Sequence, residues 1–154
     1  MALATYSDLK TSIANWLNRS DLTTEIAEDF IVLAEADFNS KLRIRKMNTS
    51  TSITIDSETE SMPSDFLQVR DFFITEGGTK YALKYITPAQ MDQIKGSSTS
   101  GMPSTYTILG DNFRFAPTPS GSYTGTLNYY AKFPALSDTN TSNYILASHP
   151  AIYL

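Results

Sequence analysis

The sequence predicts an α+β fold with an N-terminal helical hairpin, an antiparallel β-region of about six strands with one short inserted helix, and a C-terminal helix cut off at its start. Apolar residues recur at helical spacing through residues 1–46, and after Met47 they alternate with polar residues at the period of a strand. Helices at the ends of a chain with strands between them are typical of this class. We expect residues 1–46, 47–134 and 135–154 to form one structural unit.

The first helix is expected over residues 6–18. Thr5 and Asp8 have the spacing of a capping box, in which each side chain accepts a hydrogen bond from the other residue's backbone. The apolar residues of this segment recur three or four positions apart. They are Leu9, Ile13, Trp16 and Leu17.

A second helix should begin near Asp21 or Thr23 and pack against the first as a hairpin. Its apolar positions form one stripe, with acidic residues mostly off it. The stripe consists of Ile26, Phe30, Leu33, Ala34, Phe38 and Leu42. The short turn "NRSD" before this helix favours antiparallel packing of the two.

The β-region begins with the alternation of Ile53 and Ile55 with Ser and Thr, followed by a polar loop. The segments 66–76 and 79–86 then predict a hairpin that turns at Gly77-Gly78. The short helix 88–95 follows, with Thr87 as its N-cap, Pro88 at its first position and Gln90 completing a capping box.

A second predicted hairpin turns at residues 110–112, and a long strand runs from residue 123 until Pro134 ends it. Residues 135–154 form an irregular segment, a helical turn at 144–148 and the start of a C-terminal helix opened by Pro150. His149, the only histidine, is therefore interpreted as part of a helix-start signal.

The residues point to no enzymatic activity, cofactor or metal site. A single histidine cannot supply the common zinc ligand sets, and no G-x-S-x-G or phosphate-binding glycine motif is present. The loop of Asp56, Glu58 and Glu60 starts like a calcium loop, but Ser61 and Leu67 stand where that motif needs glycine and glutamate. No apolar run approaches the roughly eighteen residues of a membrane helix.

The net charge of −4 makes the chain a poor candidate for general nucleic-acid binding, because basic residues supply most of that affinity. One basic cluster, at positions 41–46, stands out. It contains Lys41, Arg43, Arg45 and Lys46. These cations either complement the dipole of the preceding helix or contact an acidic partner surface or DNA phosphates. We expect Arg43 and Arg45 to act through a contact with another subunit or a protein partner rather than through tight DNA binding.

Adjacent aromatic residues on a strand place one ring on each face of a sheet, and one of those faces is expected to be an interface, so Tyr129 and Tyr130 are candidate interface residues. Ile152, Tyr153 and Leu154 are further candidates, because a truncated helix leaves apolar surface that favours association. One function that the residues leave open is a β-rich carbohydrate- or protein-binding module of a surface structure, with Tyr123, Tyr129 and Tyr130 in its binding face.

The order of features resembles the head-tail adaptor (head-completion or connector) proteins of tailed bacteriophages, of the short-tailed type. The segments that carry the resemblance are residues 5–47, "MPSDFLQVRDF", "LKYITPAQMDQI" and residues 106–154, which together span nearly the whole chain. None is a catalytic signature, but their order and spacing are specific.

The resemblance implies a non-enzymatic virion protein that is made in the host cytoplasm and located at the head-tail interface. It would form a homo-oligomeric ring of twelve subunits between the portal protein and the next tail component, which is a nozzle, stopper or tail tube. The ring would surround the channel of the passing genomic DNA without binding it tightly, and no membrane is involved. Family members continue past the equivalent of "HPAIYL", so we expect the last helix to extend further.

Overall fold

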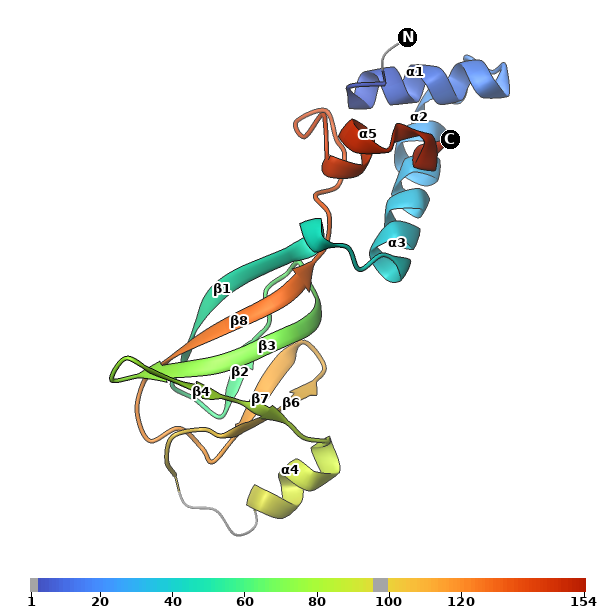
Figure 1. Ribbon diagram of the computed structural model, residues 1–154. Coiled ribbons are helices and arrows are strands. Elements are labelled where there is room, and N and C mark those ends of the chain that lie inside the picture. The colour runs from blue at the N-terminus through green and yellow to red at the C-terminus, as the bar shows by residue number, and fades with distance from the viewer. Residues whose placement is uncertain (1–2, 96–99) are drawn as a thin grey trace. The chain divides into compact units, whose positions relative to one another are not determined.

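The computed structural model describes residues 3–95 and 100–154 and confirms the α+β class (Figure 1). The chain divides into two compact units. The helical unit contains Met1–Met47 and Lys132–Leu154, and the β-unit contains Asn48–Ala131. Residues 132–154, at the far end of the sequence, thus belong to the same unit as the N-terminal helices.

The first helix of the helical unit is α1, Tyr6–Leu17. The expected capping box is present: the Asp8 amide donates to Thr5 Oγ1 at 3.2 Å, and the Thr5 amide donates to Asp8 Oδ2 at 3.0 Å. Asn18 ends the helix in the left-handed conformation, at φ 51°. Leu9 and Ile13 are buried as expected, whereas Trp16 is 75% exposed.

The second helix consists of α2, Thr23–Glu25, a π-helical turn, Ile26–Phe30, and α3, Ile31–Lys41. Ile31 donates its amide to the Ile26 carbonyl five residues back, so the turn holds one more residue than an α-helical turn. The extra residue rotates everything after it about the helix axis. Ile31 is buried in consequence, and the predicted stripe is wrong at Phe30 and Leu33, which are 45% and 66% exposed.

The C-terminal segment completes the core of the helical unit (Figure 1). It contains α5, Tyr144–Ser148, and a 3₁₀ turn, Pro150–Tyr153, so the predicted start at Pro150 is a 3₁₀ turn rather than an α-helix. Apolar side chains of this segment pack against both helices. They are Leu136, Ile145, Leu146 and Tyr153, against Tyr6, Leu9, Ile13, Ile26, Ile31 and Phe38.

The described part of the β-unit contains eight strands and one helix, where about six strands and one helix were expected. The strands are β1 Asn48–Ile55, β2 Thr59–Ser61, β3 Phe66–Glu76, β4 Thr79–Ala82, β5 Lys84–Tyr85, β6 Thr105–Leu109, β7 Asn112–Ala116 and β8 Tyr123–Ala131. The helix is α4, Pro88–Lys95, which has the expected cap at Thr87. Sheet 1 has the order β1-β8-β3-β4, and sheet 2 the order β2-β7-β6-β5 (Figure 1).

Two features account for the extra strands. Strand β2 lies within the expected polar loop, where Glu60 faces Phe113 of β7. The predicted strand 79–86 is divided at Leu83, with β4 in sheet 1 and β5 in sheet 2. Strand β5 pairs parallel with β6, so the region is not wholly antiparallel.

The core of the β-unit is aromatic and takes side chains from both sheets. Phe113 and Phe115 of sheet 2 are fully buried, and their rings lie 5.2 and 5.7 Å from the ring of Phe72 in sheet 1. Most of these pairs meet edge to face, which is a favoured arrangement of aromatic rings.

Gly125 of β8 occupies a crowded position in this core. A Cβ atom there would lie 2.7 Å from Ile55 Cδ1, 3.1 Å from the Phe72 ring and 3.2 Å from the Ile53 carbonyl oxygen. We therefore expect Gly125→Ala to lower the free energy of unfolding by about 1–3 kcal/mol in urea denaturation. The matched control is Gly121→Ala, where a Cβ atom meets nothing within 4 Å. Equal stability of the two variants would contradict the prediction.

Candidate interaction surfaces

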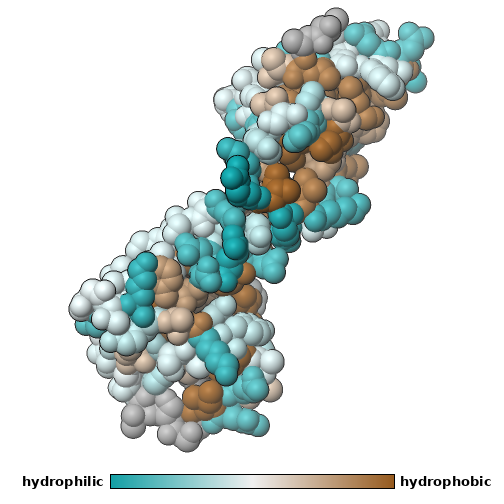
Figure 2. All heavy atoms as spheres, viewed as in Figure 1, coloured by the Kyte–Doolittle hydropathy of each residue, from teal (hydrophilic) through white to brown (hydrophobic). Residues whose placement is uncertain are grey.

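Large apolar side chains are exposed on the helical unit. Most of them lie near the end of α1 and in the second helix, where the π-helical turn has rotated them away from the core. The exposed helical face consists of Trp16, Leu17, Phe30, Val32 and Leu33. Figure 2 shows apolar surface on this unit. Large exposed apolar surface marks an interaction site in many proteins.

Two of the four cations in the basic cluster are engaged at the end of α3. Lys41 Nζ lies 2.6 Å from Asp37 Oδ1, four residues earlier. The Arg43 guanidinium donates to the carbonyl oxygens of Asn39 at 2.8 Å and Leu42 at 2.6 Å, so it satisfies groups at the helix end. The structure thus supports local stabilisation for these two residues.

The other two cations precede the β-unit, in a 3₁₀ turn, Arg45–Met47. Both side chains are exposed. Lys46 Nζ lies 5.5 Å from the centre of the Tyr144 ring, which is within the range of a cation–π contact. Arg45 and Lys46 are therefore the members of the cluster best placed to meet a partner.

Tyr129 and Tyr130 lie on opposite faces of sheet 1, as expected for neighbours on a strand. Tyr129 is 4% exposed in the core, and its hydroxyl donates to Asp65 Oδ1 at 2.8 Å. Burial and the Asp65 carboxylate raise the pKa of Tyr129 to about 12. Tyr130 is half-buried on the outer face, where the Arg70 guanidinium lies 5.7 Å from its ring centre.

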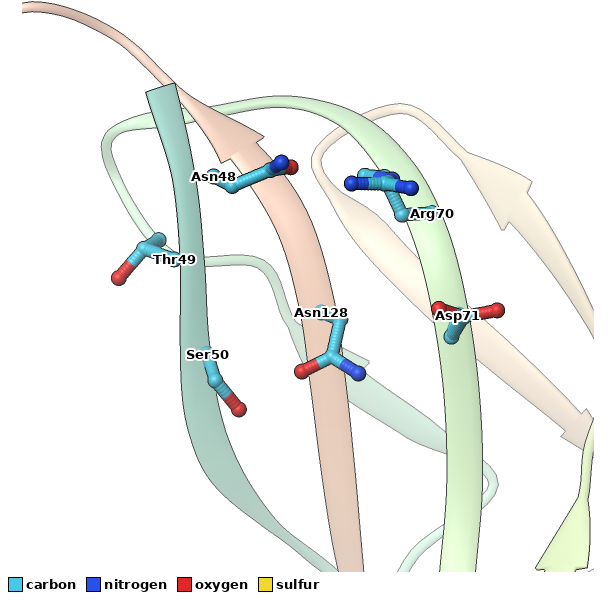
Figure 3. Close-up of a pocket in the computed structure, with 6 residues that line it drawn as sticks. All are labelled: Asn48, Thr49, Ser50, Arg70, Asp71 and Asn128. Carbon is cyan, nitrogen blue, oxygen red and sulfur yellow. The ribbon is translucent and has the colours of Figure 1, made fainter. Parts of the chain in front are cut away.

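A polar groove of about 340 Å³ crosses the outer face of sheet 1. It is lined by Asn48, Thr49, Ser50, Arg70, Asp71 and Asn128. In Figure 3, Asn48 on β1 and Arg70 on β3 extend toward each other across β8. Asn48 Oδ1 is shielded from solvent and has no hydrogen-bond partner among the described residues.

Glu35 is a buried carboxylate in the helical unit, with 8% of the residue exposed. Its Oε1 atom accepts hydrogen bonds from the Leu136 amide at 3.0 Å and the Tyr153 hydroxyl at 3.1 Å. Asn143 Nδ2 donates to the Tyr153 hydroxyl at 2.8 Å. Burial raises the pKa of Glu35, and the two hydrogen bonds to it partly oppose that effect. This network ties the C-terminal segment to α3.

The raised pKa of Glu35 predicts a pH dependence of stability. Protonation of Glu35 stabilises the folded chain below the pKa of the unfolded state, and this contribution is lost as pH rises through the folded pKa. We expect the melting temperature of Glu35→Gln, measured by circular dichroism from about pH 4 to 7, to fall less with rising pH than that of the wild type. Glu28→Gln, at an exposed position of the same helix, is the control. Parallel profiles for Glu35→Gln and the wild type would contradict the prediction.

The three C-terminal candidate interface residues differ in their exposure. Tyr153 is buried against Phe38, with ring centres 5.0 Å apart, whereas Ile152 and Leu154 are exposed. His149 is exposed and precedes the 3₁₀ turn, where its carbonyl oxygen accepts from the Ile152 amide at 3.1 Å. It therefore takes part in the helix-start signal.

The acidic loop after β1 has local partners. Glu58 pairs with Arg114 at 2.8 Å, and Glu60 Oε1 accepts from the Ser57 hydroxyl at 2.8 Å. Within residues 3–95 and 100–154, no cluster of three or more potential metal ligands was found. None of the helices described is both long enough and apolar enough to span a membrane.

The exposed helical face, Glu35 and the groove were not found from the sequence. Helical periodicity assigned Phe30 and Leu33 to the core, because nothing in the pattern signals a π-helical turn. Glu35 had no visible signal, because its donors, Leu136 and Tyr153, are about a hundred residues away in the chain. Asn48, Ser50 and Ser52 stand at alternate positions of β1 and so lie on one face, which could have indicated a polar sheet face.

Comparison with known proteins identifies the family. No curated protein matches the chain. The sequence model described as SU10 adaptor protein matches residues 4–154, which is nearly the whole chain. This match confirms the resemblance to phage head-tail adaptors, and such structural adaptors are not a class of enzymes. The chain belongs to the SU10 adaptor protein family and is a structural adaptor component of a bacteriophage virion.

Proposed function

We propose that the protein is one subunit of a ring that joins the portal to the tail and surrounds the DNA channel. The observation that carries this proposal is the exposed helical face, whose large apolar side chains need a protein partner. Portal docking is assigned to this face, with the exposed cations Arg45 and Lys46 and the exposed apolar residues Ile152 and Leu154 as further candidate contacts. The next tail component, a nozzle, stopper or tail tube, binds elsewhere on the ring.

A homo-oligomeric ring of twelve subunits is the expected assembly. Each subunit in a ring presents two different surfaces, one to each neighbour, and the ring closes when the rotation between neighbours allows it. Electron microscopy and native mass spectrometry of the purified protein, alone and mixed with the portal of the same phage, test the proposal. Closed rings seated on the portal are expected. A protein that stays monomeric with the portal present contradicts it.

We expect the protein to bind the passing DNA only weakly. Lys41 and Arg43 are engaged at the helix end, so few cations of the basic cluster remain to neutralise phosphates. We expect fluorescence anisotropy with a duplex oligonucleotide to show little binding at about 0.15 M salt. Binding that stays tight at this salt concentration would argue against a conduit through which DNA slides.

The polar groove favours a second candidate function, a module that binds carbohydrate. Amide, hydroxyl and guanidinium groups line it, and the ring of Tyr130 lies beside Arg70. A glycan array probed with the wild type and with Tyr130→Ala tests this alternative. Specific binding that is lost in a folded Tyr130→Ala variant would favour it over the adaptor ring as the role of the β-unit.

A further inference from the structure

The four edge strands of the two sheets are unequal. Strands β2, β4 and β5 have three, four and two residues, whereas β1 has eight. Edge strands carry backbone groups that can pair with another chain, and proteins commonly protect them by keeping them short. Strand β1 is therefore the exception among the edges of the described chain.

Strand β1 also lacks several other common forms of edge protection. Its sequence, Asn48–Ile55, contains no charged residue and no proline. Its pairing with β8 is continuous over all eight residues, whereas the β3–β8 pairing has two register shifts. No described strand pairs with its outer edge. A long, regular, uncharged edge of this kind is suited to accept a further strand.

The topology of sheet 1 supplies a matching edge. Each neighbouring pair in the order β1-β8-β3-β4 is antiparallel, so β1 and β4, at the two edges, run in opposite directions. Copies in a ring are related by a rotation that keeps strand direction nearly constant from one copy to the next. When β1 of one copy meets β4 of the next, the two strands are therefore antiparallel.

The side chains of β4 leave its edge open to such a pairing. All four residues of β4 are exposed, and its one charged group, Lys80, lies over the Phe73 ring at 4.6 Å rather than beyond the edge. Tyr81 pairs with the buried Ile74 and so faces the core side of the sheet, yet it is 43% exposed. Tyr81 therefore has apolar surface that an added strand would cover.

The two edges fit each other in side-chain chemistry. Ile53 faces the core side of β1 and is half-buried, and a β-branched residue opposite an aromatic one is a favourable cross-strand pair. When Ile53 lies opposite Tyr81, Thr54 lies opposite Lys80. Asp56, the first charged residue after β1, is then diagonal to Lys80 and of opposite charge.

We propose that β1 of one copy pairs antiparallel with β4 of the next, so that sheet 1 continues from copy to copy around the ring. This inference rests on the proposed ring and identifies the surfaces through which its subunits meet. The pairing joins two different edges, as a head-to-tail contact requires.

Disulfide cross-linking tests this pairing directly, because the chain has no cysteine of its own. Opposite residues of an antiparallel pair have Cα atoms about 4.5–5.5 Å apart, which is within the range of a disulfide. The variant Ile53→Cys with Tyr81→Cys is assembled on the portal, oxidised and run on a non-reducing gel. We expect a ladder of dimers, trimers and higher oligomers that collapses on reduction.

Three controls make the result specific. Each single-cysteine variant should give no cross-link, and Ile53→Cys with Leu109→Cys should give none because Leu109, although exposed, lies at the end of β6 in sheet 2. A cross-linked dimer of Ile53→Cys alone would mean that β1 meets β1, which overturns the proposal. The substitution at Ile53 could disturb folding, so three further double variants avoid it. Each combines Lys80→Cys with a cysteine at one exposed position, which is Ser52, Thr54 or Asp56.

The outcomes separate this inference from the proposed function. Rings on the portal with the expected ladder support both. Rings on the portal without a ladder from any of the four cysteine pairs overturn the β1–β4 pairing and leave the ring standing. A wild-type chain that forms no ring with the portal overturns the proposed function and, with it, the pairing.

Discussion

A glutamate in place of Leu33 should prevent assembly with the portal while leaving the helical unit folded. Leu33 is 66% exposed, so the substitution removes few contacts within the chain, and its effect on stability should stay within about 0.5 kcal/mol. In the assembly, however, the carboxylate would be buried without a partner, at a cost of about 3 kcal/mol or more for each copy. Because every subunit carries the same change, the cost recurs around the ring.

Native mass spectrometry and electron microscopy with the portal measure the loss of assembly, and thermal unfolding measures stability. The matched control is Thr24→Glu, which adds the same charge at an exposed position in α2, outside the exposed helical face. We expect that control to assemble normally. If Leu33→Glu assembles as well as Thr24→Glu, the exposed helical face is not the portal contact.

The second large effect is expected in the core of the β-unit. Phe113 is fully buried, and its ring lies 5.2 Å from Phe72 and 5.6 Å from Phe66, centre to centre. Phe113→Ala should lower the free energy of unfolding by about 3–5 kcal/mol, through lost apolar contact and the cavity left behind. Urea unfolding followed by far-ultraviolet circular dichroism measures the loss.

Phe73→Ala is the comparison, since Phe73 is half-buried on the outer face of sheet 1 and leaves no enclosed cavity. Its loss should be clearly smaller than that of Phe113→Ala. Similar losses for the two variants would mean that the aromatic core is not where the stability of the β-unit lies.

Local signals in the sequence predicted much of the fold. The capping boxes at Thr5 and Thr87 and the hairpin glycines at Gly77 and Gly78 act within a few residues, so their outcome does not depend on the rest of the chain. The α+β class and the family were also predicted, because both depend on the order of elements rather than on individual contacts.

What could not be predicted depends on contacts between distant residues. The π-helical turn after Glu25 has no periodicity signal, yet it decides that Ile31 is buried and Leu33 is exposed. At Leu83 the chain leaves sheet 1 and enters sheet 2, because β4 ends at Ala82 and β5 begins at Lys84. The residues on both sides of Leu83 had been predicted as one continuous strand. The exposed helical face and the groove were missed for the same reason, since exposure is a property of packing rather than of residue type.

The two places where the chain passes between units have a consequence for how such a protein is built. Asn48 begins β1, Ala131 ends β8, and Asn48 lies directly opposite Tyr130, so entry and exit are neighbours. The two hydrophobic clusters share no residue. A turn of a few residues would bridge these two ends, so the topology allows residues 48–131 to be inserted or deleted at a single point of the chain.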